Sequence, residues 1–145
     1  MANILLLNGP NLDRLGSRET DIYGDTSLAE IEAEAARLAD SLGHRLEAKQ
    51  SNAEHELIAT IHDSPDRYDL IIFNPAGFTH TSVALRDALL AVEVPFIEVH
   101  LSNIAAREPF RRHSYFTDVA VGFIAGFGPQ VYELAVRAAA EILSN

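Results

Sequence analysis

Short apolar runs alternate with helical patterns along the chain, and this alternation constrains the fold more than any other feature of the sequence. The runs predict five strands, over Ile4–Asn8, Arg45–Lys49, Asp69–Phe73, Pro95–His100 and Val119–Ile124. Between and after them, apolar residues spaced three and four apart predict helices over residues 28–42, Glu54–Ser64, Ser82–Val92 and Pro129–Leu143. Strands that alternate with helices form parallel sheets that are covered on both faces.

The predicted fold class is therefore α/β, with one domain over residues 1–145. Right-handed crossovers leave few topologies for five strands. The favoured one is a flavodoxin-like three-layer sandwich whose five-stranded parallel sheet has the order 2-1-3-4-5. Such sheets bind ligands at the carboxyl ends of their strands, so functional residues are expected in the segments that follow the strands.

Charge and cysteine content exclude several classes of partner. The chain has 21 acidic and 11 basic residues, a formal net charge of −10. Nucleic acids and anionic membranes bind basic faces, so neither is expected as a partner. The absence of cysteine excludes disulfides, thiolate nucleophiles and cysteine zinc sites. The N-terminus lacks the pattern of a signal peptide, and the longest nearly apolar run, Val119–Phe127, is shorter than the ~20 residues that span a bilayer. We expect a soluble, cytoplasmic protein.

Polar side chains gather in the segments that follow the predicted strands. Two histidines, His80 and His100, can supply an acid and a base near neutral pH. Five arginines in an acidic chain predict a small anionic ligand, because guanidinium groups pair with carboxylates through two bonds. Taken alone, each residue is more typical of a turn, a strand end or a solvated helix face. The arginines are Arg14, Arg18, Arg107, Arg111 and Arg112, and they are accompanied by Asn8, Asn11, Tyr23, Asn74 and Ser102.

Motifs of other catalytic classes are missing from the sequence. His80 and His100 have no carboxylate at the usual ligand spacing, so no metal site is expected. The chain has no GxSxG elbow, no Walker A motif and no GxGxxG motif. The run Gly122–Gly128 has the spacing GxxxGxG, which we interpret as close packing of a helix on a strand.

Three other functions share this fold class. An FMN carrier of the flavodoxin type requires a hydroxyl-rich loop after the first strand, but this chain has no hydroxyl from Asn8 until Ser17. A phospho-receiver domain requires an aspartate after the third strand and a lysine after the fifth, where this chain has Asn74 and the glycines at 122–126. A non-catalytic binder of small acids is harder to exclude by fold, although it would not need both Tyr23 and His100.

Three long motifs resemble the type II 3-dehydroquinate dehydratases. They are LLLNGPNLDRLGSRETDIYG (Leu5–Gly24), NPAGFTHTSVALRDAL (Asn74–Leu89) and EVHLSNIAAREPFRRHSYF (Glu98–Phe116). Thr20 stands where proline is common, and Ala105–Ala106 replace a frequent His-Ala pair, but neither position is catalytic in the family. The resemblance implies the reversible conversion of 3-dehydroquinate to 3-dehydroshikimate without cofactor or metal, in aromatic biosynthesis or in quinate breakdown.

The same resemblance implies a role for each site residue. Tyr23 is the base that removes the C2 proton, and Arg18 and Arg107 favour its ionised form. Asn11 holds a water against the developing enolate, and His100 donates a proton to the leaving C1 hydroxyl. Asp87 reaches the site of a neighbouring subunit in the family, which implies trimers that usually assemble into a dodecamer. The substrate-binding positions are Asn74, His80, Asp87, Leu101, Ser102 and Arg111.

The residues themselves agree with this mechanism. A free tyrosine has a pKa of about 10, and a contacting cation lowers such a pKa by ~1–3 units. Arg18 shares a loop with Tyr23, close enough in sequence to approach it. The single lysine, Lys49, lies inside a predicted strand, which argues against a Schiff-base mechanism. The loop from Arg14 to Asp25 is long and contains Gly16 and Gly24, so we predict that it acts as a lid.

Overall fold

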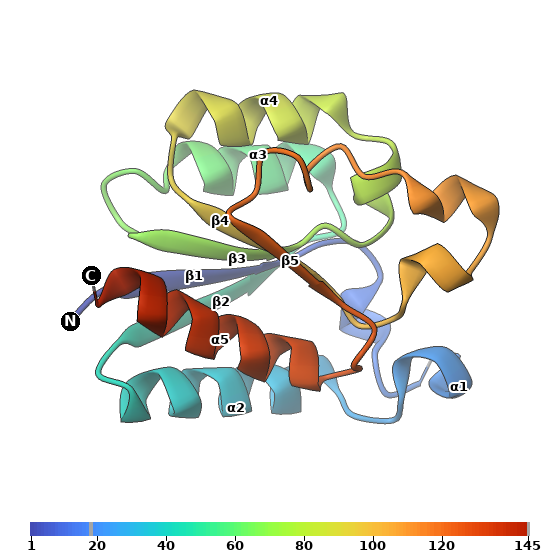
Figure 1. Ribbon diagram of the computed structural model, residues 1–145, viewed down its shortest axis with the longest axis horizontal. Helices are drawn as coiled ribbons and strands as arrows, with labels where there is room; N and C mark the ends of the chain where they lie inside the picture. Colours follow the sequence, from blue (N-terminus) through green and yellow to red (C-terminus); the bar gives the residue numbers. More distant parts are fainter. Residues whose placement is uncertain (18, 145) are drawn as a thin grey trace.

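The computed structural model describes residues 1–17 and 19–144 and has a central sheet between two pairs of helices (Figure 1). The strands are β1 (Asn3–Asn8), β2 (Arg45–Gln50), β3 (Leu70–Asn74), β4 (Phe96–His100) and β5 (Gly122–Ala125). The helices that cover them are α2 (Leu28–Ser41), α3 (Glu54–His62), α4 (Val83–Val92) and α5 (Gln130–Leu143). All strand pairs are parallel and the order is β2-β1-β3-β4-β5, which confirms the predicted fold class.

Each face of the sheet is buried under one pair of helices. Leu6 and Ile72 belong to the core cluster that includes residues of α2 and α5. Leu7 and Phe73 belong to the cluster that includes residues of α3 and α4. Figure 1 shows these pairs of helices on opposite sides of the sheet. Burial on both faces explains why the central strands are continuous apolar runs in the sequence.

Serine caps begin two of the covering helices. The Ser27 Oγ accepts a hydrogen bond of 3.2 Å from the backbone N–H of Glu30 at the start of α2. The Ser82 Oγ accepts one of 3.0 Å from Leu85 at the start of α4. Such caps satisfy backbone N–H groups that have no partner within the helix.

The last strand is shorter than the sequence predicts. The predicted strand covers Val119–Ile124, whereas β5 begins at Gly122. The N–H groups of Val119 and Ala120 both donate to the carbonyl of Phe116, at 3.0 Å, so the chain turns there instead of pairing. Both side chains pack against the core beside α3 and α4. The first part of the apolar run, Val119 and Ala120, therefore reflects packing on the core and not strand pairing.

The glycines after β5 also have a different role from the predicted one. A Cβ atom on Gly122 or on Gly128 would meet nothing within 4 Å, so close packing does not explain them. Gly126 and Gly128 have φ angles of 100° and 62°, in the region that favours glycine. The packing interpretation is wrong, and these two glycines serve the turn that leads into α5.

The long segment after β1 contains two short helical turns, η1 (Leu12–Arg14) and α1 (Thr20–Tyr23). Tyr23 is the last residue of α1 and packs beside the α2–α5 core. The predicted lid residue Arg18 lies outside the described residues. Within the described part of the chain, no helix has the length and apolar character needed to cross a membrane.

Candidate active site

A cavity of about 160 Å³ lies beyond the carboxyl ends of β1, β3 and β4. This is the edge where the strand order reverses and where ligands bind in sheets of this type. A larger groove of about 820 Å³ lies between α2 and α5, but among the described residues its walls contain no histidine and only Arg37 as a cation. The smaller cavity contains two histidines and two arginines and is therefore the candidate site for acid–base chemistry. Its walls are formed by Pro10, Asn11, Leu12, Tyr23, Asn74, Ala76, Gly77, His80, His100, Leu101, Ser102, Ile104, Arg107 and Arg111.

Arg107 brings a cation onto Tyr23. Its Nη1 donates a hydrogen bond of 2.8 Å to the Tyr23 hydroxyl oxygen, and its guanidinium carbon lies 5.3 Å from the centre of the tyrosine ring. The same Nη1 lies 3.2 Å from the Ser102 Oγ, to which it also donates. The contact places a permanently charged guanidinium group directly against the phenol oxygen.

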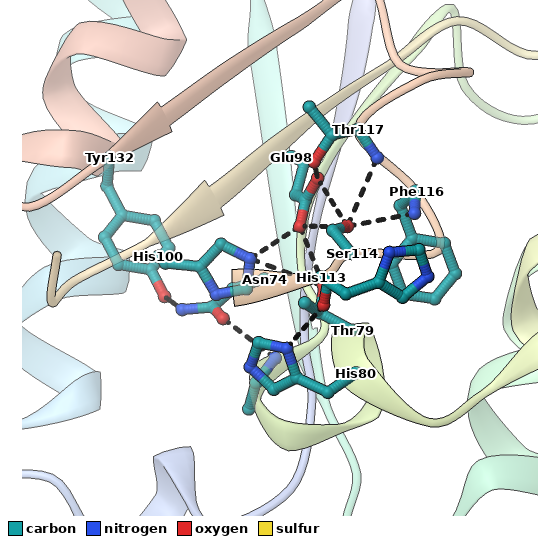
Figure 2. Close-up of polar contacts among 11 residues, drawn as sticks. Asn74, Thr79, His80, Glu98, His100, His113, Ser114, Phe116, Thr117 and Tyr132 are labelled. Atoms are coloured by element: carbon teal, nitrogen blue, oxygen red, sulfur yellow. Dashed lines mark hydrogen bonds and ion pairs between the residues drawn. The ribbon is translucent and has the colours of Figure 1, made fainter. Parts of the chain in front are cut away.

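His100 is held by a buried carboxylate on its own strand. Glu98 and His100 are two residues apart in β4, so their side chains share one face of the sheet. The His100 Nε2 lies 2.6 Å from the Glu98 Oε2, and the Thr79 Oγ1 donates to the same carboxylate oxygen at 2.8 Å. Figure 2 shows these three side chains in one hydrogen-bonded group. Glu98 is fully buried, so His100 has a fixed partner away from solvent.

His100, together with hydroxyl groups around it, keeps the pKa of the Glu98 carboxyl low. Burial by itself would raise the pKa of Glu98, but hydrogen bonds from His100, Thr117 and Thr79 and the charge of His100 hold it below the ordinary value. Ser114 also donates to both carboxylate oxygens, at 3.1 and 2.9 Å. An ionised Glu98 can only accept, so the Nε2 of His100 carries a hydrogen, and Nδ1 is the ring nitrogen that remains able to gain or lose one.

His80 lies beside His100 in a neutral state. The two rings are stacked with their centres 6.5 Å apart. The His80 Nδ1 lies 2.7 Å from the carbonyl oxygen of His113, and a carbonyl only accepts, so Nδ1 carries the hydrogen. Burial lowers the pKa of His80, and the bond to His113 opposes this shift only in part. In this form the Nε2 of His80 can accept a hydrogen bond from a ligand in the cavity.

The structure brings most of the predicted site residues together. Asp87 is an exception, because it is exposed on α4 and lines a different hollow together with Arg86 and Tyr115. Of the five arginines expected at this edge, Arg14 and Arg112 are exposed and outside the cavity, and Arg18 is outside the described residues. The predicted residues that line the cavity are Asn11, Tyr23, Asn74, His80, His100, Leu101, Ser102, Arg107 and Arg111.

Glu98 and Thr79 are missing from the predicted site. The sequence does contain a signal for Glu98, since an acid inside the apolar run PFIEVH, two residues before a histidine, lies on the same strand face. The sequence-based expectation concerned only carboxylates at metal-ligand spacing, and it did not include the Glu98–His100 contact of 2.6 Å. Over residues 1–17 and 19–144, no group of three or more histidine, aspartate or glutamate side chains is arranged to hold a metal ion.

Comparison with known proteins agrees with this geometry. Residues 2–140 match the family model described as Dehydroquinase class II. The chain is 61% identical to a 3-dehydroquinate dehydratase of Edwardsiella ictaluri (strain 93-146), over 99% of this chain and 96% of that protein. It is 60% identical to a 3-dehydroquinate dehydratase of Cellvibrio japonicus (strain Ueda107), over 100% of this chain and 99% of that protein.

A solved structure shows the same similarity in three dimensions. The type II dehydroquinase of Propionibacterium acnes has a TM-score of 0.93 to this chain and 42% identity, with 97% of each chain covered. The chain therefore belongs to the class II dehydroquinase family.

Proposed function

We propose that the chain dehydrates 3-dehydroquinate through an enolate, with Tyr23 as the base and His100 as the acid. The dehydratase activity itself follows from membership of the family, in which the similar proteins are named 3-dehydroquinate dehydratase. The observation that carries the mechanism is the 2.8 Å hydrogen bond from Arg107 to the Tyr23 hydroxyl, inside the cavity that also contains His100.

The first step is removal of a proton from C2. The tyrosinate oxygen of Tyr23 takes this proton, and the electron pair of the C–H bond passes to the C3 carbonyl, which becomes an enolate. Arg107 supports this step because its positive charge lies against the oxygen that must be ionised. Asn11 lines the same cavity and is proposed to hold a water against the enolate. Arg18 is proposed to assist from the same loop, on the resemblance alone.

The second step is loss of the C1 hydroxyl, on the opposite face of the ring. The enolate re-forms the C3 carbonyl, the C1–O bond breaks, and the hydroxyl leaves as water with a proton from His100. Glu98 supports this step by holding the Nε2–H of His100, which leaves Nδ1 to deliver the proton. One proton is taken from C2 and one is given to the leaving group, so the reaction releases only water.

A Schiff-base mechanism does not fit the position of the only lysine. Lys49 lies in β2, where it pairs in register with Leu7, and it is not among the residues that line the cavity. Its Nζ lies 3.9 Å from the Glu47 carboxylate. An imine with the C3 carbonyl would require a lysine at the reacting carbon.

The remaining predicted residues are proposed to bind the anionic substrate. Arg111 supplies a second cation to the cavity, and Ser102 and the Leu101 backbone lie at the end of β4. Asn74 supplies an amide, and His80 supplies the ring acceptor described above. A carboxylate with several hydroxyl groups matches this mixture of cations, donors and acceptors.

We also propose that the active unit is a symmetric trimer, assembled further into a dodecamer. Asp87 is exposed and outside the cavity of its own chain, so it can act in the reaction only by entering the cavity of a neighbour. Each chain forms one catalytic domain, and in this arrangement its site lacks an aspartate until a neighbouring chain supplies Asp87. The proposed setting is the cytoplasm, in aromatic biosynthesis by the shikimate and chorismate route or in quinate breakdown.

An ultraviolet assay with 3-dehydroquinate tests the proposal, because the product contains a conjugated enone that the substrate lacks. Tyr23→Phe keeps the ring and removes the ionisable oxygen, so kcat should fall by at least ~10²-fold, the lower range for loss of a general base. Tyr68→Phe is the matched control, since the Tyr68 hydroxyl bonds Glu47 away from the cavity. Near-normal turnover by Tyr23→Phe would show that another group takes the proton.

A further inference from the structure

Behind the cavity, three buried side chains from distant parts of the chain form one hydrogen-bonded series. Asn8 ends β1 and Asn74 ends β3, and the two residues are partners in the strand register. Tyr132, in the first turn of α5, bridges them: its hydroxyl lies 2.7 Å from the Asn74 Nδ2 and 2.7 Å from the Asn8 Oδ1. All three residues are buried, and Figure 2 shows the contact between Tyr132 and Asn74. Of the three, only Asn74 lines the cavity.

The direction of every hydrogen bond in this series follows from one backbone group. The N–H of Ala76 lies 3.0 Å from a side-chain atom of Asn74, and a backbone N–H can only donate. That atom of Asn74 is therefore the oxygen Oδ1, and the atom that faces Tyr132 is the nitrogen Nδ2. The hydroxyl oxygen of Tyr132 accepts from Nδ2, so its single hydrogen must go to Asn8.

The same series explains an unusual feature of Asn8. Its Nδ2 is a buried atom without a hydrogen-bond partner among the described residues. Turning the amide over would give that nitrogen the Tyr132 oxygen as a partner, but the tyrosine hydrogen would then have no acceptor in the series. Burial also raises the pKa of Tyr132, so the hydroxyl keeps the hydrogen that it gives to Asn8. A buried amide nitrogen without a partner lowers the stability of the fold. The Asn8 Nδ2 is in this position because the Asn8 Oδ1 has to accept the hydrogen of the Tyr132 hydroxyl.

We infer that Tyr132, with Asn8 behind it, is a positioning residue that fixes Asn74 as a hydrogen-bond donor toward the substrate. The Asn74 Oδ1 is occupied by Ala76, whose φ angle of 52° marks a tight turn at the cavity wall. The Asn74 Nδ2 has two hydrogens, of which Tyr132 takes one, and the other serves an oxygen atom of a ligand in the cavity. This position then selects ligands that present a carboxylate, carbonyl or hydroxyl oxygen to Asn74. The inference rests on the proposed function, because it makes Asn74 a substrate-binding residue.

The test is a double-mutant cycle on steady-state kinetics with 3-dehydroquinate. Tyr132→Phe removes the hydroxyl and leaves the Asn74 amide held by the Ala76 N–H but no longer by α5, so the Nδ2 that faces the cavity is less firmly placed. We expect KM to rise about tenfold and kcat to change less than about threefold, which is the pattern of lost binding. In the Asn74→Ala background, Tyr132→Phe should raise KM no further, because it acts only through Asn74. An equal rise in KM in both backgrounds would overturn the inference.

Two further variants separate this role from a general loss of stability. Tyr68→Phe removes the hydroxyl of another tyrosine whose ring is buried, and this hydroxyl bonds Glu47 at 2.6 Å outside the cavity, so both constants should stay unchanged. Asn8→Ala removes the acceptor of the Tyr132 hydrogen while Tyr132 stays in place, and should raise KM about threefold. An unchanged KM in Asn8→Ala would overturn the inference even if Tyr132→Phe did not fold. Wild-type protein that is inactive on 3-dehydroquinate would instead refute the proposed function.

Discussion

Arg107 donates a 2.8 Å hydrogen bond to the hydroxyl of Tyr23, a residue 84 positions earlier in the chain. The two residues come from segments that follow different strands, β4 and β1, and they meet because both strands end at the same edge of the sheet. The contact places a permanent cation on an oxygen that is neutral in a free tyrosine at neutral pH. The effect of this charge on the reaction is distinct from the effects of the other groups in the cavity, and variants can separate them.

Arg107→Ala should move the pH dependence of the reaction. If the arginine favours the tyrosinate, its loss lowers activity at neutral pH, and raising the pH restores part of it because more of the tyrosine ionises. Arg107→Lys should recover only part of the loss, since lysine brings charge without the planar fork. The measurement is kcat and kcat/KM against pH at fixed ionic strength. A loss by the same factor at every pH would assign Arg107 to the enolate or to loop closure. Arg18→Ala in the same assay tests whether Arg18 also favours the ionised form of Tyr23.

Glu98→Gln should lower kcat at least about tenfold, because the general-acid contribution that it supports is of order 10²–10⁴. The amide oxygen of glutamine still accepts from the Nε2–H of His100, so this variant removes the charge and keeps the bond. We expect KM to change less than kcat. Thr117→Val is a milder control, since it removes one hydroxyl from the carboxylate and leaves the carboxylate in place. Full activity of Glu98→Gln would show that the charge is not needed.

Glu98 should also contribute to acid sensitivity. Its pKa in the folded protein is below the ordinary value of 4.5, so on acidification the unfolded chain takes up this proton first. The stability that Glu98 contributes is present above about pH 4.5 and is lost as the pH falls through its folded pKa. Urea unfolding from pH 6 to pH 3 should therefore show a smaller loss of stability for Glu98→Gln than for wild type. Parallel curves for the two proteins would contradict the assignment.

Mixed oligomers should reveal the predicted contribution of Asp87. Tyr23→Phe lacks the base, and Asp87→Ala lacks the side chain given to a neighbour, so each protein alone should have little activity. In mixed trimers, a chain with intact Tyr23 can lie beside a chain with intact Asp87. Random mixing in equal amounts should rebuild about a quarter of the sites. Activity that does not rise above the average of the unmixed variants would place Asp87 outside the neighbour's site.

Gly9→Ala should destabilise the fold at the strand ends. A Cβ atom on Gly9 would lie 2.6 Å from the Pro75 carbonyl oxygen, closer than real Cβ contacts allow. Relief of this clash requires β1 and β3 to separate where Asn8 and Asn74 pair, and we expect a loss of ~1–3 kcal/mol in urea unfolding. Gly77→Ala is the matched control, because a Cβ atom there would meet nothing within 4 Å. Equal stability of Gly9→Ala and wild type would contradict this prediction.

Much of the fold was predictable because its signals are local. Buried parallel strands produce apolar runs, and half-buried helices produce a period of three to four residues, so four of the five strands and all four covering helices lie close to their predicted bounds. The exception, β5, shows the limit of such signals. Val119 and Ala120 are apolar because they pack on the core, and their sequence does not say whether the backbone pairs or turns.

The sequence by itself determined the order of the elements, the edge of the sheet where polar residues gather, and the family resemblance through three motifs. Only the tertiary structure decided which of those residues meet. Strand register places Asn8 beside Asn74. Helix α5 brings Tyr132, which lies 124 residues after Asn8 in the chain, into contact with both. Helix α4 places Asp87 outside the cavity. The physical reason is that side-chain contacts between distant segments depend on strand order and helix packing, which a local pattern of apolar residues does not specify.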